Sequence, residues 1–334
     1  HGTKYKGCWA VVLRVSCLFW VFPPSFCNRE RSAVCIRAKL QVALLPASLR
    51  QIKFLTKIGR FMAFWARMRN VFGCDELSKN RDIWRMLMAE FVGPLFLVLV
   101  GCASCVEGWN DQYSPHIVQV ALSFGITIAT MAQALGHVSG GHFNPAVTVA
   151  CLVTGKISIV KSIFYIIAQC LGAICGAALL QALTPTEFHN TLGVTEVHKA
   201  LTPTQGFGVE FFSTFTLVLV VFGVCDDNRK DVKGSGPLAI GLCIATAILA
   251  TGNYTGGSLN PARSLGPAVI SNKWNYHWVY WAGPIVGGVV AALTYQKAFK
   301  ARSPEEEVEL ESYHQYRIAN SKESEIIADR TTTI

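Results

Sequence analysis

Six long apolar runs constrain this chain more than any other feature of its sequence. An α-helix needs about 20 consecutive, mainly apolar residues to cross the hydrocarbon core of a lipid bilayer. The runs that reach or approach this length are Trp84–Val106, His116–Leu135, Ser158–Leu183, Gly206–Cys225, the shorter Pro237–Thr251, and His277–Phe299. We therefore expect an all-α membrane protein with six tilted transmembrane helices, embedded in the lipid bilayer.

The composition of the chain is typical of a membrane bundle. Hydrophobic residues make up 51% and charged residues 15% of the chain, whereas soluble domains average about 25% charged residues. The net charge of +9 comes from basic residues that crowd the first 85 positions, while the tail carries the acidic run 305–307. Basic residues beside membrane spans usually mark the cytoplasmic side, so we interpret this charge as topology and expect no nucleic-acid partner.

The first 60 residues do not fit the pattern of a bundle. Their apolar stretch, Val11–Phe22, is interrupted by Arg14 and stops at Pro23, so it is too short to span a membrane. We predict that this stretch is disordered or an artefact of the predicted coding region, with Met62 or Met68 as the natural start. The expected domains are a basic N-terminal region at 1–83, a helical bundle at 84–300 and a cytoplasmic polar tail at 301–334.

Two further apolar segments are only about half a span long, and each begins with Asn-Pro. They are Asn144–Thr154 and Asn260–Ile270. Asn is a favoured N-cap, and Pro is tolerated at the first helical position because its missing N–H would be unpaired there in any case. A segment of this length is more often a re-entrant half-helix than a crossing. We therefore expect two re-entrant half-helices that begin at these motifs.

The two halves of the bundle repeat one another. Ala89-Glu90-Phe91 is echoed by Val209-Glu210-Phe211, and the repeats cover about 84–183 and 206–299. Each half holds three crossings, an odd number, so the second copy enters the membrane from the opposite side. The result is an inverted repeat whose related sites meet near the middle of the bilayer. The lysines and arginines of the connections favour an arrangement with both chain ends in the cytoplasm.

The segments around the two Asn-Pro motifs resemble the two pore loops of the aquaporin family. They read Ser-Gly-Gly-His-Phe-Asn-Pro-Ala-Val-Thr at 139–148 and Asn-Tyr-Thr-Gly-Gly-Ser-Leu-Asn-Pro-Ala-Arg-Ser at 253–264. The similarity extends from about Trp84 to Lys300 and is strongest to the animal water-selective branch. The resemblance implies a passive water channel of the plasma membrane, with one pore per subunit in a homotetramer.

The resemblance assigns the centre of the pore to two motifs, Asn144, Pro145 and Ala146 in the first half and Asn260, Pro261 and Ala262 in the second. The N-terminus of each half-helix carries about half a positive elementary charge. Two such ends facing each other oppose cations, protons included. The side-chain amides of both asparagines can donate to one water oxygen. A water held in this way cannot accept the next hydrogen bond in a file of waters, so proton relay is broken there.

The resemblance also places the constriction of the pore at Phe124, Ile248, Gly257 and Arg263. Arg263 is a charge at membrane depth, where such a residue costs at least about 2.5–3.5 kcal/mol, so it needs water or a partner. Water-selective members usually have His in place of Ile248, and Ile offers a stiff apolar wall instead of a hydrogen bond. Ser264, in contrast, is typical of the water-type members, so we expect the channel to conduct water. Because of the apolar Ile248, we expect it to conduct glycerol or urea as well.

Five more residues are expected to support or line the pore. Glu90 and Glu210 are midspan carboxylates at equivalent positions of the repeat, and we expect them to accept backbone N–H groups freed by the non-helical loops. A proton relay is the alternative role for these two carboxylates. Gly140, Gly141 and His142 precede the first motif, and their backbone carbonyls are expected to form a ladder of hydrogen-bond acceptors.

Other classes of protein are weighed against a channel. A secondary transporter would share the inverted repeat but should carry a cluster of charges in its core, where only Arg263 is expected. A junctional or adhesive membrane protein with little permeability is the second alternative. The sequence offers no nucleophile–base set, metal cluster or phosphate loop, so we expect no enzyme, catalytic residue, metal or cofactor. The terminal Thr332-Thr333-Ile334 fits a loose pattern for capture by a scaffold domain.

Overall fold

The computed structural model describes residue 73 and residues 82–107, 113–189, 192–229, 231–232 and 234–332. The predictions for the first 60 residues, including a start at Met62 or Met68, lie outside these residues, as do Thr333 and Ile334. Every regular element in the described part of the chain is a helix, which confirms the predicted all-α class.

Five helices within the described residues are long and apolar enough to cross a membrane. They are α5 (Ile83–Ala103), α6 (Ile117–Ser139), α8 (Ile159–Leu183), α9 (Pro203–Val224) and α10 (Gly236–Thr255). Large apolar side chains lie on the outside of these helices as well as inside the bundle, and Trp84, Leu183 and Phe212 are each more than two-thirds exposed. An outer surface this apolar is suited to lipid, so the chain is a multi-pass membrane protein.

The sixth predicted crossing is not a plain α-helix. The run expected at His277–Phe299 contains α12 (Val279–Thr294), which continues directly into a π-helical turn, η2 (Tyr295–Phe299). The turn closes where the Lys300 N–H donates to the Tyr295 carbonyl at 2.8 Å, five residues back, as in a π-helix. α12 alone is therefore shorter than the other crossings, and α12 together with η2 fills the predicted run.

The fifth crossing is longer than the run Pro237–Thr251 that we predicted. α10 continues through the polar residues Asn253 and Tyr254 and ends at Thr255. The polar residues hide the end of the helix from a hydropathy argument. The helix stops only at Gly256, which adopts a left-handed conformation with a φ of 81° and donates its N–H to the Gly252 carbonyl.

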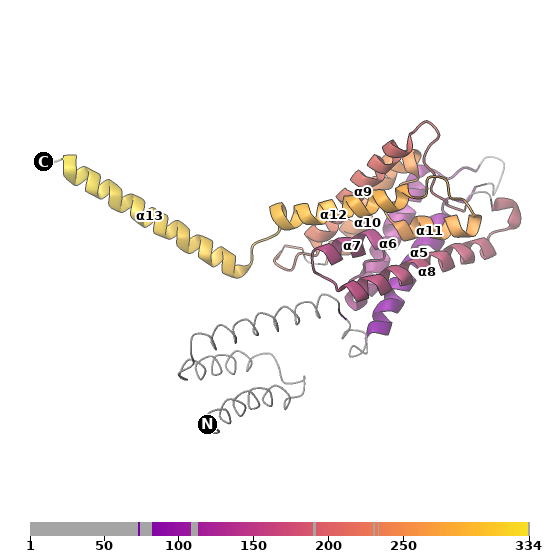
Figure 1. The fold of residues 1–334 in the computed structure, drawn as a ribbon, viewed down its shortest axis with the longest axis horizontal. Helices are drawn as coiled ribbons and strands as arrows, with labels where there is room; N and C mark the ends of the chain where they lie inside the picture. The colour runs from indigo at the N-terminus through magenta and orange to yellow at the C-terminus, as the bar shows by residue number, and fades with distance from the viewer. Residues whose placement is uncertain are drawn as a thin grey trace, which may run out of the picture. The chain divides into compact units, whose positions relative to one another are not determined.

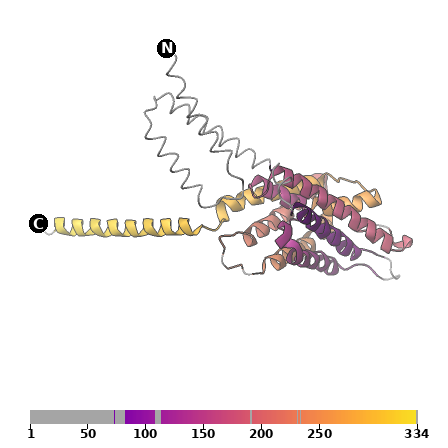
Figure 2. The same ribbon diagram turned by 90° about the horizontal axis from the view of Figure 1, so that it is seen from below.

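The remaining helical elements complete the described fold. The half-helices are α7 (Pro145–Val153) and α11 (Pro261–Ser271), the 3-10 turn η1 (Thr186–Phe188) follows α8, and α13 (Pro304–Thr332) lies in the tail. α7 and α11 lie among the long helices in both views (Figures 1 and 2). Both half-helices pack on α8 of the first half and on α12 of the second. Each half-helix is therefore held by long helices of both halves.

Glycines let the long helices approach closely in the same way in both halves. A side chain at Gly172 of α8 would collide with the Phe91 carbonyl of α5. A side chain at Gly287 of α12 would collide with the Phe211 carbonyl of α9. Both glycines belong to Gly-x-x-x-Gly pairs, a spacing that allows close helix contacts in a membrane.

Candidate functional site

Both half-helices begin at an asparagine that caps its own helix. The Asn144 side-chain Oδ1 accepts the backbone N–H of Ala146 at 2.8 Å. The Asn260 Oδ1 accepts the backbone N–H groups of Ala262 at 3.0 Å and Arg263 at 3.3 Å. Each asparagine has extended backbone angles, and a proline occupies the first helical position after it. The local chemistry of Asn-Pro therefore starts both helices, as the sequence indicates.

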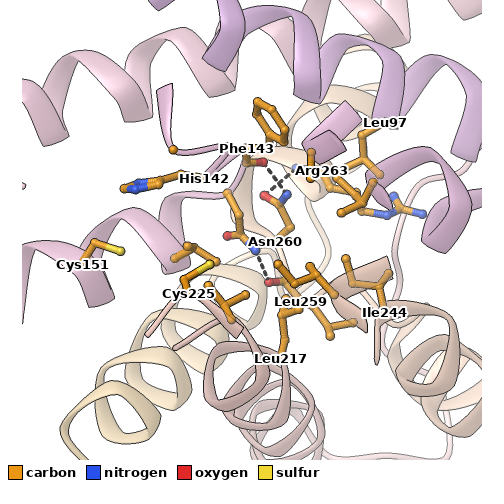
Figure 3. Close-up of a pocket in the computed structure, with 18 of the residues that line it drawn as sticks. Leu97, His142, Phe143, Cys151, Leu217, Cys225, Ile244, Leu259, Asn260 and Arg263 are labelled. Carbon is orange, nitrogen blue, oxygen red and sulfur yellow. Dashed lines mark hydrogen bonds between the residues drawn. The ribbon is translucent and has the colours of Figure 1, made fainter. Parts of the chain in front are cut away.

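The two asparagines also bind the opposite loop. Asn144 Nδ2 donates to the Leu259 carbonyl at 2.8 Å, and Asn260 Nδ2 donates to the Phe143 carbonyl at 2.9 Å (Figure 3). Each amide carries two N–H groups, so one N–H on each asparagine is left for another acceptor. Both asparagines line the same cavity. The structure thus brings the two helix starts together, with a free donor on each.

Phe143 and Leu259, which supply these carbonyls, have unusual backbone conformations. Their φ angles are 49° and 56°, in the left-handed region that residues other than glycine rarely adopt. Each lies directly before its asparagine, at the equivalent position of the repeat. The left-handed turn costs roughly 1–2 kcal/mol per residue, so it must be held by the surrounding structure.

Two buried carboxylates hold these strained loops. Glu90 accepts the backbone N–H groups of His142 at 3.0 Å and Phe143 at 2.8 Å. Glu210 accepts those of Ser258 at 3.0 Å and Leu259 at 2.8 Å. Both glutamates are fully buried. A carboxylate that accepts two backbone N–H groups replaces the bonds that a helix would have made, so each loop can remain non-helical at membrane depth.

Hydroxyl groups extend each carboxylate's set of hydrogen bonds. In the first half, Ser139 Oγ and Gln169 Nε2 both donate to Glu90 at 2.6 Å. In the second half, Thr255 Oγ1 donates to Glu210 at 2.6 Å. The pattern repeats between the halves except for Gln169, which also donates to Thr148 Oγ1 at 2.9 Å in the first half.

A cavity of about 420 Å³ is lined by residues from both halves. The predicted site residues that line it are Phe124, Gly140, Gly141, His142, Asn144, Ile248, Gly257, Asn260 and Arg263. Cys151 and Cys225 lie on one side of Asn260 and Arg263 lies on the other (Figure 3). The cavity therefore passes the point where the two half-helices meet. Pro145, Ala146, Pro261 and Ala262 are buried and are not among the residues that line the cavity.

The four residues expected at the constriction form two contacting pairs that line the same cavity. The guanidinium carbon of Arg263 lies 4.6 Å from the centre of the Phe124 ring, and Arg263 Nη1 donates to the Gly193 carbonyl at 2.6 Å. A side chain at Gly257 would lie 3.2 Å from Ile248 Cγ1. Arg263 Nε is buried and has no hydrogen-bond partner among the described residues. One face of this part of the cavity is apolar, and the other presents a cationic donor.

His142 lines the cavity next to the first half-helix. Its Nδ1 lies 3.1 Å from Thr148 Oγ1, and its ring meets the edge of Tyr165 with ring centres 5.4 Å apart. These contacts fix the plane of the imidazole. Gly140 and Gly141 line the same cavity before it and have φ angles of 94° and 61°. Their positive φ angles favour glycine and turn this stretch of backbone along the cavity.

Several lining residues were not identified from the sequence. Leu97 and Leu217 line the cavity at equivalent positions of the repeat, and the repeated Leu-Val-Leu-Val stretches that begin with them could have revealed this. Gly193, which binds Arg263, lies in the connection between α8 and α9. It contributes a backbone carbonyl, so no side-chain pattern pointed to it.

The connection after α9 forms the other end of the cavity, where Asp227 is a lining residue. Its neighbour Asp226 accepts the Tyr295 hydroxyl and the Ala301 N–H, each at 2.9 Å. Partial burial tends to raise the pKa of the Asp226 carboxyl, but the bonds from Ala301, Asn228 and Tyr295 together lower this pKa below its ordinary value. An ionised Asp226 thus ties this connection to the chain that follows η2.

These features define a class of membrane protein. The molecule is a multi-pass membrane protein in which two half-helices, each led by an asparagine, meet beside a cavity in the centre of a helical bundle. Within the described residues, no cluster of His, Cys, Asp and Glu could hold a metal ion.

Comparison with known proteins assigns the family. The model of the major intrinsic protein family matches residues 77–295. Mouse aquaporin-4 is 52% identical over 223 residues, which cover 66% of this chain and 69% of the mouse protein. Bovine aquaporin-2 is 46% identical over 211 residues, covering 63% and 77% of the two chains. The chain belongs to the major intrinsic protein, or aquaporin, family, whose members are channels and not enzymes.

A solved structure gives the same assignment for the fold. The X-ray structure of the aquaglyceroporin from Plasmodium falciparum matches with a TM-score of 0.59 at 25% sequence identity. The match covers 65% of this chain and 96% of the parasite protein. The predicted aquaporin-like fold and the family resemblance are therefore confirmed, whereas the predicted domain boundaries at 83 and 300 stay predictions.

Proposed function

We propose that this protein is a passive channel that conducts water and small uncharged solutes such as glycerol and urea, and that it excludes protons and ions. The observation that carries the proposal is the meeting of Asn144 and Asn260 beside one cavity, each with one amide N–H free. Similarity to aquaporin-4 and aquaporin-2 supports conduction of water. The aquaglyceroporin of similar fold supports the wider range of solutes.

Proton exclusion follows from how the two asparagines bind water. Each amide donates one N–H to the opposite loop, so the remaining N–H groups of Asn144 and Asn260 can both donate to one water oxygen in the cavity. That oxygen then has no lone pair left to accept a hydrogen bond from the next water, and the proton wire is interrupted. The positive ends of α7 and α11, about half an elementary charge each, repel cations at the same point.

Solute selection is assigned to the constriction formed by Phe124, Ile248, Gly257 and Arg263. Arg263 lines the cavity, and the guanidinium N–H groups that Gly193 does not bind can donate to a hydroxyl or carbonyl oxygen of the solute. Ile248 and Phe124 offer hydrocarbon to the carbon atoms of a polyol, and Gly257 packs closely on Ile248, where an added Cβ would lie 3.2 Å from Ile248 Cγ1. The guanidinium charge repels cations. A polar donor beside an apolar wall suits glycerol and urea as well as water.

The remaining predicted residues have supporting roles in this proposal. Glu90 and Glu210 are assigned a structural role, because backbone N–H groups already occupy their oxygens. Gly140, Gly141 and His142 are assigned to the wall of the passage, where their carbonyls accept hydrogen bonds from passing water.

Assembly and location complete the proposal. Family membership supports a homotetramer in the plasma membrane, and the charges of the connections support cytoplasmic chain ends.

Osmotic water flux out of proteoliposomes tests the channel directly. We expect the full chain to give rapid osmotic shrinkage with a low temperature dependence, compared with protein-free liposomes. Ile248→Trp should abolish this flux, because the side chain at this position is 3% exposed and lines the cavity. Leu249→Trp is the matched control, since the next residue of α10 is 46% exposed on the outer surface. Flux at the protein-free level would instead support the adhesive alternative.

A further inference from the structure

The connection between α8 and α9 reaches the constriction through one backbone carbonyl. Arg263 Nη1 donates to the Gly193 carbonyl at 2.6 Å. Gly193 has a φ of 73°, and a side chain there would lie 2.6 Å from Cβ of Cys102 in α5. Gly193 is therefore packed directly on α5 while its carbonyl holds Arg263. The backbone position of Gly193 decides where the guanidinium lies.

Three hydroxyl groups join the same connection to the second half-helix. Thr195 Oγ1 lies 2.6 Å from Ser264 Oγ, which lies 2.6 Å from Ser258 Oγ. Ser258 Oγ donates to the Asn260 carbonyl at 3.0 Å. All four residues are buried, with no more than 6% of any side chain exposed. Bulk water therefore does not compete for these bonds.

The last bond fixes the direction of the other two, because each hydroxyl has one proton to donate. Ser258 gives its proton to the Asn260 carbonyl, so it must accept in its contact with Ser264. Ser264 then donates to Ser258 and accepts from Thr195. Hydrogen bonds that point the same way along a buried chain polarise and strengthen one another.

These bonds close a ring around Arg263. The Arg263 guanidinium is bound to Gly193, and Thr195 follows Gly193 by two residues. Thr195 is bound to Ser264, which directly follows Arg263 in α11. Movement of the connection away from α11 would therefore break both contacts together.

We propose that Thr195 and Ser264 are positioning residues that determine solute specificity. Their hydrogen bond fixes the Gly193 carbonyl and, through it, the guanidinium of Arg263. The inference rests on the proposed channel function and deepens it, because it names the residues that hold Arg263 in place and so set the width of the constriction. When the bond is lost, the connection gains freedom and Arg263 loses a fixed partner. Glycerol then passes more easily, while water, which already passes the intact constriction, is little affected.

The test compares glycerol and water permeability of the full chain in proteoliposomes. Thr195→Val keeps the shape of the side chain without its hydroxyl, and Thr195→Ser keeps the hydroxyl. We expect Thr195→Val to raise the glycerol-to-water permeability ratio roughly fivefold. The loss of one hydrogen bond changes the ratio between the released and held positions of the connection by about this factor. Thr195→Ser should retain the wild-type ratio.

Two further variants separate positioning from general packing. Thr184→Val is the matched control, because Thr184 is also buried but its hydroxyl donates to the Leu180 carbonyl of its own helix. Ser264→Ala removes the same bond as Thr195→Val, so the double variant should change the ratio no more than the larger single effect. If Thr195→Val conducts no water, the permeability ratio of Ser264→Ala provides the test of the bond instead.

Three results would overturn the inference. They are a wild-type ratio in both Thr195→Val and Ser264→Ala, an equal rise in Thr184→Val, or a rise in Thr195→Ser that matches the valine variant. Failure of the proposed channel function is distinct, because it would appear as wild-type water flux no greater than that of protein-free liposomes.

Discussion

Arg263 and Ile248 present opposite chemistry to the same part of the cavity. The guanidinium is stacked on Phe124 and bound to Gly193, yet its Nε remains without a partner among the described residues. The guanidinium lines the cavity, so the N–H groups that Gly193 does not bind can donate to a passing solute. The Ile248 side chain has no group that can form a hydrogen bond with a solute. The residue at position 248 therefore determines whether the constriction replaces the hydrogen bonds that a water molecule loses on entry, or instead favours a solute with carbon atoms.

Replacing Ile248 by histidine should shift the channel toward water. The imidazole would form a hydrogen bond with a water molecule that has lost its neighbouring waters. Glycerol would lose its apolar contact with the isoleucine side chain. We expect Ile248→His to lower the glycerol-to-water permeability ratio roughly tenfold, in line with the discrimination that a pocket reaches by exchanging one apolar contact for a polar group. Swelling of oocytes in isosmotic glycerol measures this ratio. Absence of glycerol flux in both wild type and variant would refute the proposed glycerol permeability.

The helices of the bundle depend on backbone-to-backbone approach as much as on side-chain packing. α12 rests on α9 where Gly287 meets the Phe211 carbonyl, and α8 rests on α5 where Gly172 meets the Phe91 carbonyl. α9 and α5 carry Glu210 and Glu90, which hold the strained loops. A change in the spacing between these helices would therefore move the two glutamates and, with them, the loops that they bind.

Gly287→Val should destabilise the bundle, because its Cβ has no room beside the Phe211 carbonyl. Overpacking of this kind costs roughly 1–3 kcal/mol. We expect a lower midpoint of thermal unfolding in detergent, together with reduced water flux. Gly208→Val is the control, since a side chain at this position of α9 would meet nothing within 4 Å. Equal midpoints for the two variants would show that the close approach does not contribute to stability.

Much of this fold could be predicted from local sequence. Apolar length predicts the crossings, the two Asn-Pro starts predict the half-helices, and the odd number of crossings per half predicts their opposed entry. The ends of α10 and α12 were predicted less well. The polar Asn253 and Tyr254 hide the last turn of α10, and the π-helical turn at Tyr295 depends on packing and not on hydropathy.

The candidate site divides in the same way between side chains and backbone. Asn144, Asn260 and Arg263 could be predicted because their side chains are polar at membrane depth. Gly193 and Thr195 could not, because they lie in a connection without periodicity and act through a carbonyl and one hydroxyl. Contacts between distant loops arise only when the whole chain is folded.

At the scale of the whole molecule, the two halves are joined at their centres by a reciprocal pair of bonds. Asn144 of the first half binds the Leu259 carbonyl of the second, and Asn260 binds the Phe143 carbonyl in return. Both acceptors belong to strained turns at equivalent positions. Because each bond stabilises the loop that carries the other donor, the two halves should behave as one cooperative unit at this point.

A double-mutant cycle on Asn144 and Asn260 tests this cooperativity. Each single change to alanine removes a helix cap and leaves a buried carbonyl unpaired, so we expect each to cost roughly 2–4 kcal/mol. The double variant should cost clearly less than the two effects added, because loosening one loop already weakens the bond made by the other. Asn228→Ala is the control, since its amide donates to the Ala301 carbonyl at 3.0 Å in a less buried position and should cost less than about 1 kcal/mol. Thermal unfolding in detergent measures all four variants. Strictly additive losses would mean that the two loops fold independently and that the reciprocal bonds do not couple the halves.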